Sequence, residues 1–154
     1  MLNMQTNEER YTFPKSERLR HRTLVEGLFA EGKSLYDYPL RLTWRVLSEE
    51  ALAGCFRDIL PSGIAPLQMM VTVPKKKRRK AVDRVRMRRR VRDAYRLRRR
   101  SLRALAESIP EIRTLSLSIV YIAQEDVSSE KIRRKIDRLL SKIEEQLRTT
   151  YLAE

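Results

Sequence analysis

The residues with the clearest chemical meaning are basic, and they lie close together in the middle of the chain. Between Pro74 and Arg103 the sequence contains seventeen lysines and arginines but two aspartates, so half of its thirty-four basic residues fall in this short segment. Lysine and arginine donate charged hydrogen bonds to phosphate oxygens, and the guanidinium group can donate two in parallel. This density of charge predicts a site for a polyphosphate, which we interpret as RNA.

Residues that could carry out catalysis are scarce. The chain has one histidine, one cysteine and four glycines. His21 lies between two arginines, where we expect an exposed polar role, and Cys55 has no basic partner nearby in the sequence. We find no Ser/His/Asp set, no carboxylate cluster and no glycine loop for phosphate, and one Cys with one His cannot form a zinc site. We therefore expect no catalytic residue and no metal ligand in this chain, but a binding role.

The apolar residues within the basic segment predict the helix that carries the charges. Starting from Met87 they recur at the spacing of one face of an α-helix. This face would pack on a core, and the arginines opposite would form the binding face. Val85 lies at the edge of the basic side, where the periodicity asks for a polar residue. The apolar face consists of Met87, Val91, Ala94, Tyr95, Leu102 and Leu105, and the basic face of Arg86, Arg89, Arg90, Arg96, Arg100 and Arg103.

Several segments outside this helix have the pattern of β-strands. From residue 40 to 46, apolar side chains alternate with Arg41, Thr43 and Arg45, which indicates a strand with one apolar and one polar face. Trp44 belongs to the apolar face, so we expect it in the core. A mainly apolar run before Pro74 is typical of a central strand. The further strands are expected at 34–38, 68–73 and 114–123.

Two more helices are expected to pack on this sheet. Residues 17–30 have an apolar side that ends before Gly32, and residues after Ser129 repeat isoleucine and leucine with a period of 3.6. Together these elements predict an α+β fold, with helices packed on a small mixed or antiparallel sheet.

Length and composition indicate one domain. The 154 residues are 42% hydrophobic, enough for a modest core, and the net charge of +14 opposes compaction unless a polyanion is bound. No apolar run is long enough to span a membrane, and the first residues have no secretion-signal pattern. We expect a cytoplasmic protein without membrane contact. Residues 1–12 are interpreted as a flexible tail, 13–150 as a single RNA-binding domain and 48–66 as a surface insertion.

The basic segment resembles the signature of the bacterial ribonuclease P protein component. That signature has a Lys-Lys loop after a central strand, and then a helix that opens with Arg-Asn-Arg. Two basic residues, an Arg, an acid or amide, a small residue and an aromatic follow. The sequence matches with Lys75, Lys76, Arg84, Arg86, Arg88, Arg89, Arg92, Asp93, Ala94 and Tyr95. The one departure is Val85 at the central Asn, because valine cannot make the hydrogen bonds of an amide.

The resemblance covers most of residues 13–150 and implies both fold and activity. The implied fold contains a left-handed β-α-β crossover like that of the second domain of ribosomal protein S5. The implied activity is that of an accessory subunit of the endoribonuclease ribonuclease P, a ribonucleoprotein that removes the 5′ leader of precursor tRNA. The partners would be the catalytic RNA subunit and precursor tRNA, with no obligatory protein partner. The RNA would hydrolyse the phosphodiester with Mg²⁺ that it binds mainly itself.

The resemblance also assigns roles to particular residues. A cleft between the first helix and the sheet would hold the single-stranded leader. From the pattern alone, Val25 and Phe29 fit this surface and a buried core equally well. The RNA-binding residues would be Lys75, Lys76, Arg84, Arg86, Arg88, Arg89, Arg92 and Arg96, and the leader cleft would contain Phe13, Val25, Phe29, Arg41 and Thr43.

Composition alone leaves one alternative open, a noncatalytic ribosomal or RNA-chaperone module. A basic leucine zipper does not fit, because no apolar heptad continues from Leu105 and Pro110 interrupts the helix.

Overall fold

The computed structural model describes residues 13–56 and 60–153. The tail expected at 1–12 and part of the expected insertion therefore lie outside the described residues. The elements in chain order are η1 (Lys15–Glu17), α2 (Arg22–Glu31), β1 (Lys33–Asp37), β2 (Leu40–Leu47), α3 (Glu49–Gly54), β3 (Leu67–Thr72), α4 (Ala81–Ser108), β4 (Thr114–Tyr121), α5 (Ser129–Leu147) and η2 (Arg148–Leu152).

The strands form one mixed sheet with the order β1-β2-β4-β3. Strands β1 and β2 form an antiparallel hairpin, and β2 is also antiparallel to β4. Strand β3 lies parallel to β4, so the chain must cross over between them, and α4 makes this connection. The α+β class predicted from the sequence is confirmed, and a β-α-β crossover, which the resemblance implies, is present.

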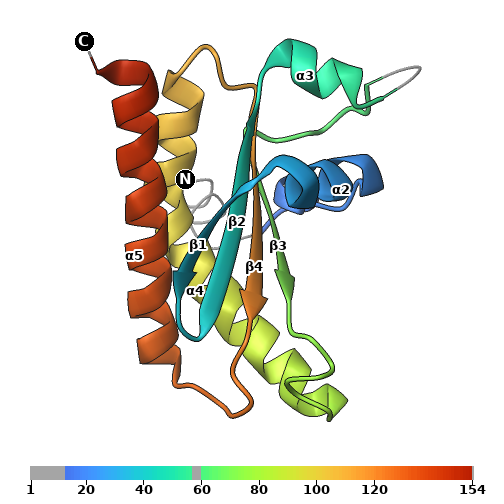
Figure 1. The fold of residues 1–154 in the computed structure, drawn as a ribbon, viewed down its shortest axis with the longest axis vertical. Coiled ribbons are helices and arrows are strands. Elements are labelled where there is room, and N and C mark those ends of the chain that lie inside the picture. Colours follow the sequence, from blue (N-terminus) through green and yellow to red (C-terminus); the bar gives the residue numbers. More distant parts are fainter. Residues whose placement is uncertain (1–12, 57–59, 154) are drawn as a thin grey trace, which may run out of the picture.

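Helices cover both faces of the sheet (Figure 1). Helices α4 and α5 pack side by side on one face, and their apolar sides join the inward residues of the strands in the main core. The predicted stripe of α4 is confirmed, since Met87, Val91, Ala94, Tyr95 and Leu102 are all buried. The expected core position of Trp44 is also confirmed.

A smaller core lies on the other face, beneath α2. Leu24 and Leu28 of this helix pack there with Leu47 at the end of β2. Leu52 and Ile64, from the segment interpreted as a surface insertion, are buried in the same cluster. The described part of this segment therefore contributes core residues as well as surface.

The expected helix at 17–30 is wrong in its first residues. The segment before α2 pairs with the free edge of β3, where Arg18 bridges Met69 and the Leu19 amide donates to the Met69 carbonyl at 3.1 Å. Because these backbone groups are engaged with the sheet, the helix cannot begin until Arg22.

Glu17 fixes this segment to α4. Its carboxylate is fully buried and lies 3.0 Å from Arg99 Nε and 2.6 Å from Arg103 Nη1. Burial raises the pKa of Glu17, although the two arginines act in the opposite direction. A buried charge of this kind depends on its partners, so the ion pairs hold the chain entry against the middle of the helix.

Arg98 makes the corresponding connection between α4 and α5. Its guanidinium group contacts Asp137 at 2.6 Å and Glu144 at 2.8 Å. Burial favours the neutral form of Glu144, but the hydrogen bonds from Arg98 and Ser101 outweigh it and lower the pKa of this carboxyl. The two helices are therefore joined by charged hydrogen bonds beside their apolar contact.

Replacing Glu17 by Ala should lower the free energy of unfolding by about 3–5 kcal/mol, because Arg99 would remain buried without this carboxylate. Denaturant unfolding measures the loss. The matched control is Glu107→Ala, which removes an exposed carboxylate 2.8 Å from Arg103 and should cost less than about 1 kcal/mol. Equal losses in the two variants would contradict a special role for Glu17.

Candidate nucleic-acid interface

The basic loop between β3 and α4 is held in shape by its own Arg78 and by Arg84 of the first turn of α4. Arg84 donates hydrogen bonds to the carbonyls of Arg78 and Arg79 at 3.0 Å and 2.7 Å. Arg78 reaches across to the Gln124 carbonyl and to the carboxylate of Asp126. The loop is thus anchored to the segment before α5.

Other arginines of α4 face α5 and are also engaged. Arg86 contacts Asp126 at 2.7 Å, and this hydrogen bond lowers the pKa of the Asp126 carboxyl. Arg90 donates to the Val127 carbonyl at 2.8 Å. Arg96, which the sequence predicts on the binding face, forms an ion pair at 3.3 Å with Asp93 of the same helix. Some of the hydrogen-bond donors of these side chains are therefore already engaged within the protein.

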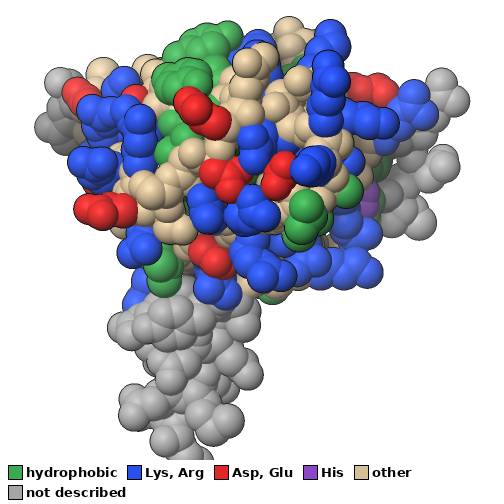
Figure 2. All heavy atoms as spheres, turned by 90° about the horizontal axis from the view of Figure 1, so that it is seen from below, with side chains coloured by type: hydrophobic (Ala, Val, Ile, Leu, Met, Phe, Trp, Pro, Cys, Tyr) green, Lys and Arg blue, Asp and Glu red, His purple; other side chains and the backbone are tan. Residues whose placement is uncertain are grey.

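A second group of predicted RNA-binding residues is differently placed. Within residues 13–56 and 60–153, Lys75, Lys76, Arg88, Arg89 and Arg92 make no ion pair with an acidic side chain. We call these five residues the arginine surface. Figure 2 views the molecule from below, toward the end where α4 and α5 begin, and shows many lysine and arginine side chains on this end.

The electrostatics of Arg92 show how strongly positive this surface is. Partial burial lowers the pKa of Arg92, and the neighbouring cations Arg18, Arg88 and Arg89 lower it further. Like charges held this close repel each other, and a bound polyanion would relieve the repulsion. The arginine surface therefore concentrates positive charge that the described acidic side chains do not pair with.

Val85 is exposed among these cations. Its side chain is 46% exposed, as expected for the edge of the basic side, and Val82 one turn earlier is 61% exposed. Neither residue belongs to the buried stripe of α4. Packing in the core therefore does not explain why valine occupies the place of the family's Asn.

The opposite face of the sheet carries polar side chains in rows across the strands. One row runs through Tyr36, Arg41, Val120 and Thr72, which are paired in register. All four side chains are exposed or half-buried, and the Arg41 guanidinium lies 5.6 Å from the centre of the Tyr36 ring. We call this row the open row, because α2 covers the rows beyond it.

The next row is covered. Thr43 is buried, and its hydroxyl lies 3.4 Å from that of Ser34. Its neighbour Ser118 is also buried, with a hydroxyl that has no described hydrogen-bond partner. Gly32 permits this close approach of α2, since a Cβ there would lie 2.7 Å from the Thr43 methyl group.

The five residues expected in a leader cleft are thus only partly brought together. Arg41 and Thr43 lie in adjacent rows of the same sheet face, and Phe29 is 53% exposed on α2, so it is not a core residue. Val25 is half-buried against the smaller core. Phe13 is elsewhere: its ring packs edge-on against Tyr95 of α4 at 5.8 Å, on the side of the main core.

Sequence reasoning missed the remaining members of the open row. Tyr36 and Thr72 lie on different strands from Arg41, and nothing in the local sequence gives the register that aligns them. The alternation of β1 with an exposed Tyr36 was the only available signal.

Two further properties of the described residues concern metals and membranes. No group of three or more His, Cys, Asp or Glu side chains in the described part of the chain could hold a metal ion. None of the described helices is both long and apolar enough to cross a membrane.

Comparison with known proteins identifies relatives. A family model described as Ribonuclease P matches residues 13–144. The ribonuclease P protein component of Porphyromonas gingivalis strain W83 is 35% identical over 83 residues, which are 54% of this chain and 52% of that protein. The chain therefore matches about half the length of the curated relatives.

Solved structures with the same fold include two bacterial proteins. The RNase P protein of Staphylococcus aureus superposes with a TM-score of 0.58 at 14% identity, covering 84% of this chain and 96% of that one. The RNase P protein from Thermotoga maritima gives a TM-score of 0.55 at 24% identity, covering 82% and 96%. At these identities the likeness establishes a shared fold.

The mixed sheet, the crossover helix and the arginine surface define a small α+β protein with a strongly basic face. The chain belongs to the Ribonuclease P protein family, because the family model spans most of its length. The resemblance found in the sequence is thereby confirmed.

Replacing Val85 by Asn should leave the free energy of unfolding within about 0.5 kcal/mol of the original, because the side chain is exposed and outside the core. Thermal or denaturant unfolding measures this. The comparison variant is Val91→Asn, which puts an amide into the buried stripe and should destabilise strongly. A clear loss in Val85→Asn would mean that this residue packs against the protein.

Proposed function

We propose that this chain is the protein subunit of a ribonuclease P ribonucleoprotein, which binds the catalytic RNA and the 5′ leader of precursor tRNA. The observation that carries the proposal is the arginine surface, where Lys75, Lys76, Arg88, Arg89 and Arg92 lack acidic partners among the described residues. Family membership supplies the identity of the ribonucleoprotein.

Physical chemistry supports RNA as the ligand of the arginine surface. Each phosphate that a cation neutralises releases condensed counterions, so binding is favoured at low salt and weakens as salt rises. Guanidinium groups on a rigid helix are already oriented, and less side-chain entropy is lost per contact than with lysines on a flexible tail. The ion pairs of Glu17 and Arg98 hold that helix in place.

The open row supports a role in holding single-stranded RNA. Unstacked bases bind to aromatic rings and to guanidinium planes, and Tyr36 with Arg41 offers both in one place. Phe29 adds an exposed ring on α2. We therefore assign the leader to a surface made by Phe29, Tyr36 and Arg41, with Thr43 in the adjacent covered row.

The chemical step is proposed to belong to the RNA. The described residues of this chain offer no donor set for Mg²⁺, so a metal ion that assists hydrolysis would be held mainly by RNA phosphates. The protein's own contribution is to position the precursor and to neutralise phosphate repulsion, which would otherwise require more Mg²⁺.

The test is cleavage of a precursor tRNA by its cognate RNA subunit over a range of Mg²⁺ concentrations, with and without the protein. We expect the protein to lower the Mg²⁺ concentration needed for half-maximal cleavage and to cleave nothing alone. Arg92→Ala should raise this concentration, because Arg92 is central to the arginine surface. Arg86→Ala should raise it less, since Arg86 already contacts Asp126.

Three outcomes would reject parts of the proposal. A protein that binds RNA without changing the Mg²⁺ requirement would be a noncatalytic RNA-binding module. Cleavage by protein freed of all RNA would place the chemistry in this chain. Equal effects of the two arginine variants would mean that internal ion pairs do not separate structural arginines from binding ones.

The leader assignment predicts different effects on two tRNAs. Phe29→Ala and Arg41→Ala should weaken binding of precursor tRNA to the ribonucleoprotein but leave that of mature tRNA unchanged, because mature tRNA has no leader. Each lost base contact is worth about 1–3 kcal/mol. Equilibrium binding measures both affinities.

The control is Leu152→Ala, which also removes an exposed apolar side chain but lies in η2. Both Phe29 and Arg41 are exposed, so their substitution should not unfold the protein. Equal losses of affinity for precursor and mature tRNA would place the leader elsewhere.

A further inference from the structure

A second basic surface lies on α5, outside the residues that the proposed function uses. Its cations are spaced at i, i+3, i+4, i+7 and i+11, so they share one side of the helix over about 16 Å. The opposite side of α5 is buried in the main core. We call Lys131, Arg134, Lys135, Arg138 and Lys142 the α5 basic surface.

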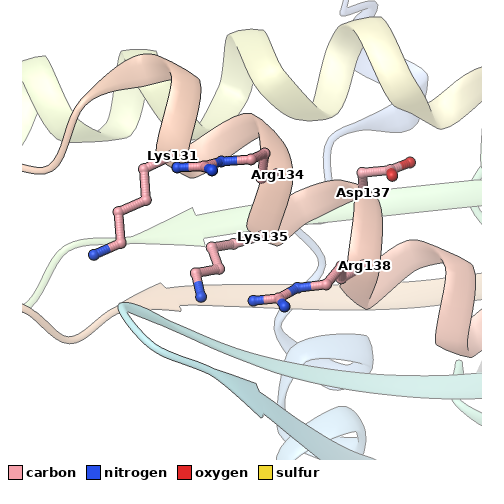
Figure 3. A pocket seen from close by; sticks show the side chains of 5 residues that line it. All are labelled: Lys131, Arg134, Lys135, Asp137 and Arg138. Atoms are coloured by element: carbon pink, nitrogen blue, oxygen red, sulfur yellow. The ribbon is translucent and has the colours of Figure 1, made fainter.

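Four of these cations line a shallow hollow of about 350 Å³ (Figure 3). The charged ends of Lys131, Lys135 and Arg138 point to the same side of the helix. Asp137 also borders the hollow, but its carboxylate points away and accepts a hydrogen bond from Arg98 at 2.6 Å. The side chains thus leave a space surrounded by positive charge.

One carboxylate compensates this charge only in part. Asp37 of β1 contacts Lys135 Nζ at 3.0 Å and Arg138 Nε at 2.9 Å. Burial favours a neutral Asp37, but these two cations outweigh it and lower the pKa of the carboxyl. Lys131 and Arg134 have no acidic partner among the residues that the structure describes, so the four cations, with Asp37 and Asp137, leave a net charge of about +2 around the hollow.

The α5 basic surface is separate from the arginine surface. Helix α5 packs against β1 and α4 packs against β3, and these strands are the two opposite edges of the sheet. Asp37, which orients Lys135 and Arg138, belongs to the β1 edge. One bound phosphate could not contact both surfaces, so the second surface requires a different segment of a polyanion.

The side chains on this face of α5 favour a nucleic-acid backbone over a membrane or a protein. A helix that lies on a membrane needs apolar residues on its outer face, and a protein interface has an apolar centre in which lysine is rare. None of the large exposed apolar side chains of the described chain is on α5. Phosphate contacts, in contrast, need only oriented cations.

We propose that the α5 basic surface binds the phosphate backbone of the same RNA partner at a second place, so that the protein bridges two segments of the RNA. The inference rests on the proposed function for the identity of that RNA. It assigns to α5 a binding role in addition to its packing in the core.

The experiment measures binding of the assembled RNA subunit to the full chain at several salt concentrations. The test variant is Lys131→Ala/Arg134→Ala/Lys142→Ala, which leaves the contacts of Asp37 intact. We expect the slope of log K against log salt to become shallower by about 2, at ~0.7–0.9 per phosphate contact. Ribose footprinting should lose protection in one RNA segment, while a variant with Arg89→Ala and Arg92→Ala loses protection in another.

The matched control, Lys15→Ala/Arg133→Ala/Arg148→Ala, removes the same charge from exposed positions that do not form one surface. If the test and control variants have the same slope and the same footprint, the inference is wrong, although the proposed function stands as long as the α4 variant is impaired. Failure of the original protein to bind the RNA subunit would instead reject the proposed function. Loss of binding to vesicles with anionic lipids, with RNA binding unchanged, would assign the surface to a membrane and overturn the inference.

Discussion

The position of α4 depends on carboxylates that come from distant parts of the chain. This helix is unusually basic, so its arginines repel one another, and burial of its apolar stripe is not the only interaction that opposes this repulsion. Glu17 neutralises it from the N-terminal segment, Asp126 from the turn before α5, and Glu144 from α5 itself. Each carboxylate ties another element to the helix, and those of Asp126 and Glu17 also engage Arg86 and Arg103 of the predicted basic face.

The same arrangement divides the basic residues of α4 by direction. Some arginines of α4 form ion pairs with carboxylates of α5, of the turn before α5 and of the N-terminal segment, whereas others form no ion pair with an acidic side chain of the described residues. Arg92 belongs to the second group, and the pKa of its guanidinium is lowered by burial and by the cations around it. The cations of α4 without acidic partners are therefore concentrated in the arginine surface and are not spread evenly over the helix.

The sheet is used differently on its two faces. One face is apolar and carries α4 and α5, while the other is polar and only partly covered by α2. Along β2 the exposure falls from Arg41 to Thr43, because the second of these lies beneath the close approach of Gly32. The open row thus lies next to a part of the sheet that α2 covers.

The sequence by itself determined the elements and the character of their faces. The stripe of α4, the alternation of β2 and the core position of Trp44 are local patterns with periods of 3.6 and 2, and the signature around Lys75 and Tyr95 is read at fixed spacing. Such information needs no knowledge of neighbours in space, so the family and the fold class followed from it.

Only the tertiary structure decided which charges are free and which rows of the sheet are open. Arg86 meets Asp126 forty residues away, and Glu17 meets Arg103 eighty-six residues away, so no local pattern separates them from Arg92. Phe13 packs against Tyr95 and not in the predicted leader cleft. The first helix is shorter than predicted, because the chain before Arg22 pairs with the edge of β3. Pairing between distant residues is set by register and packing, which depend on the whole fold.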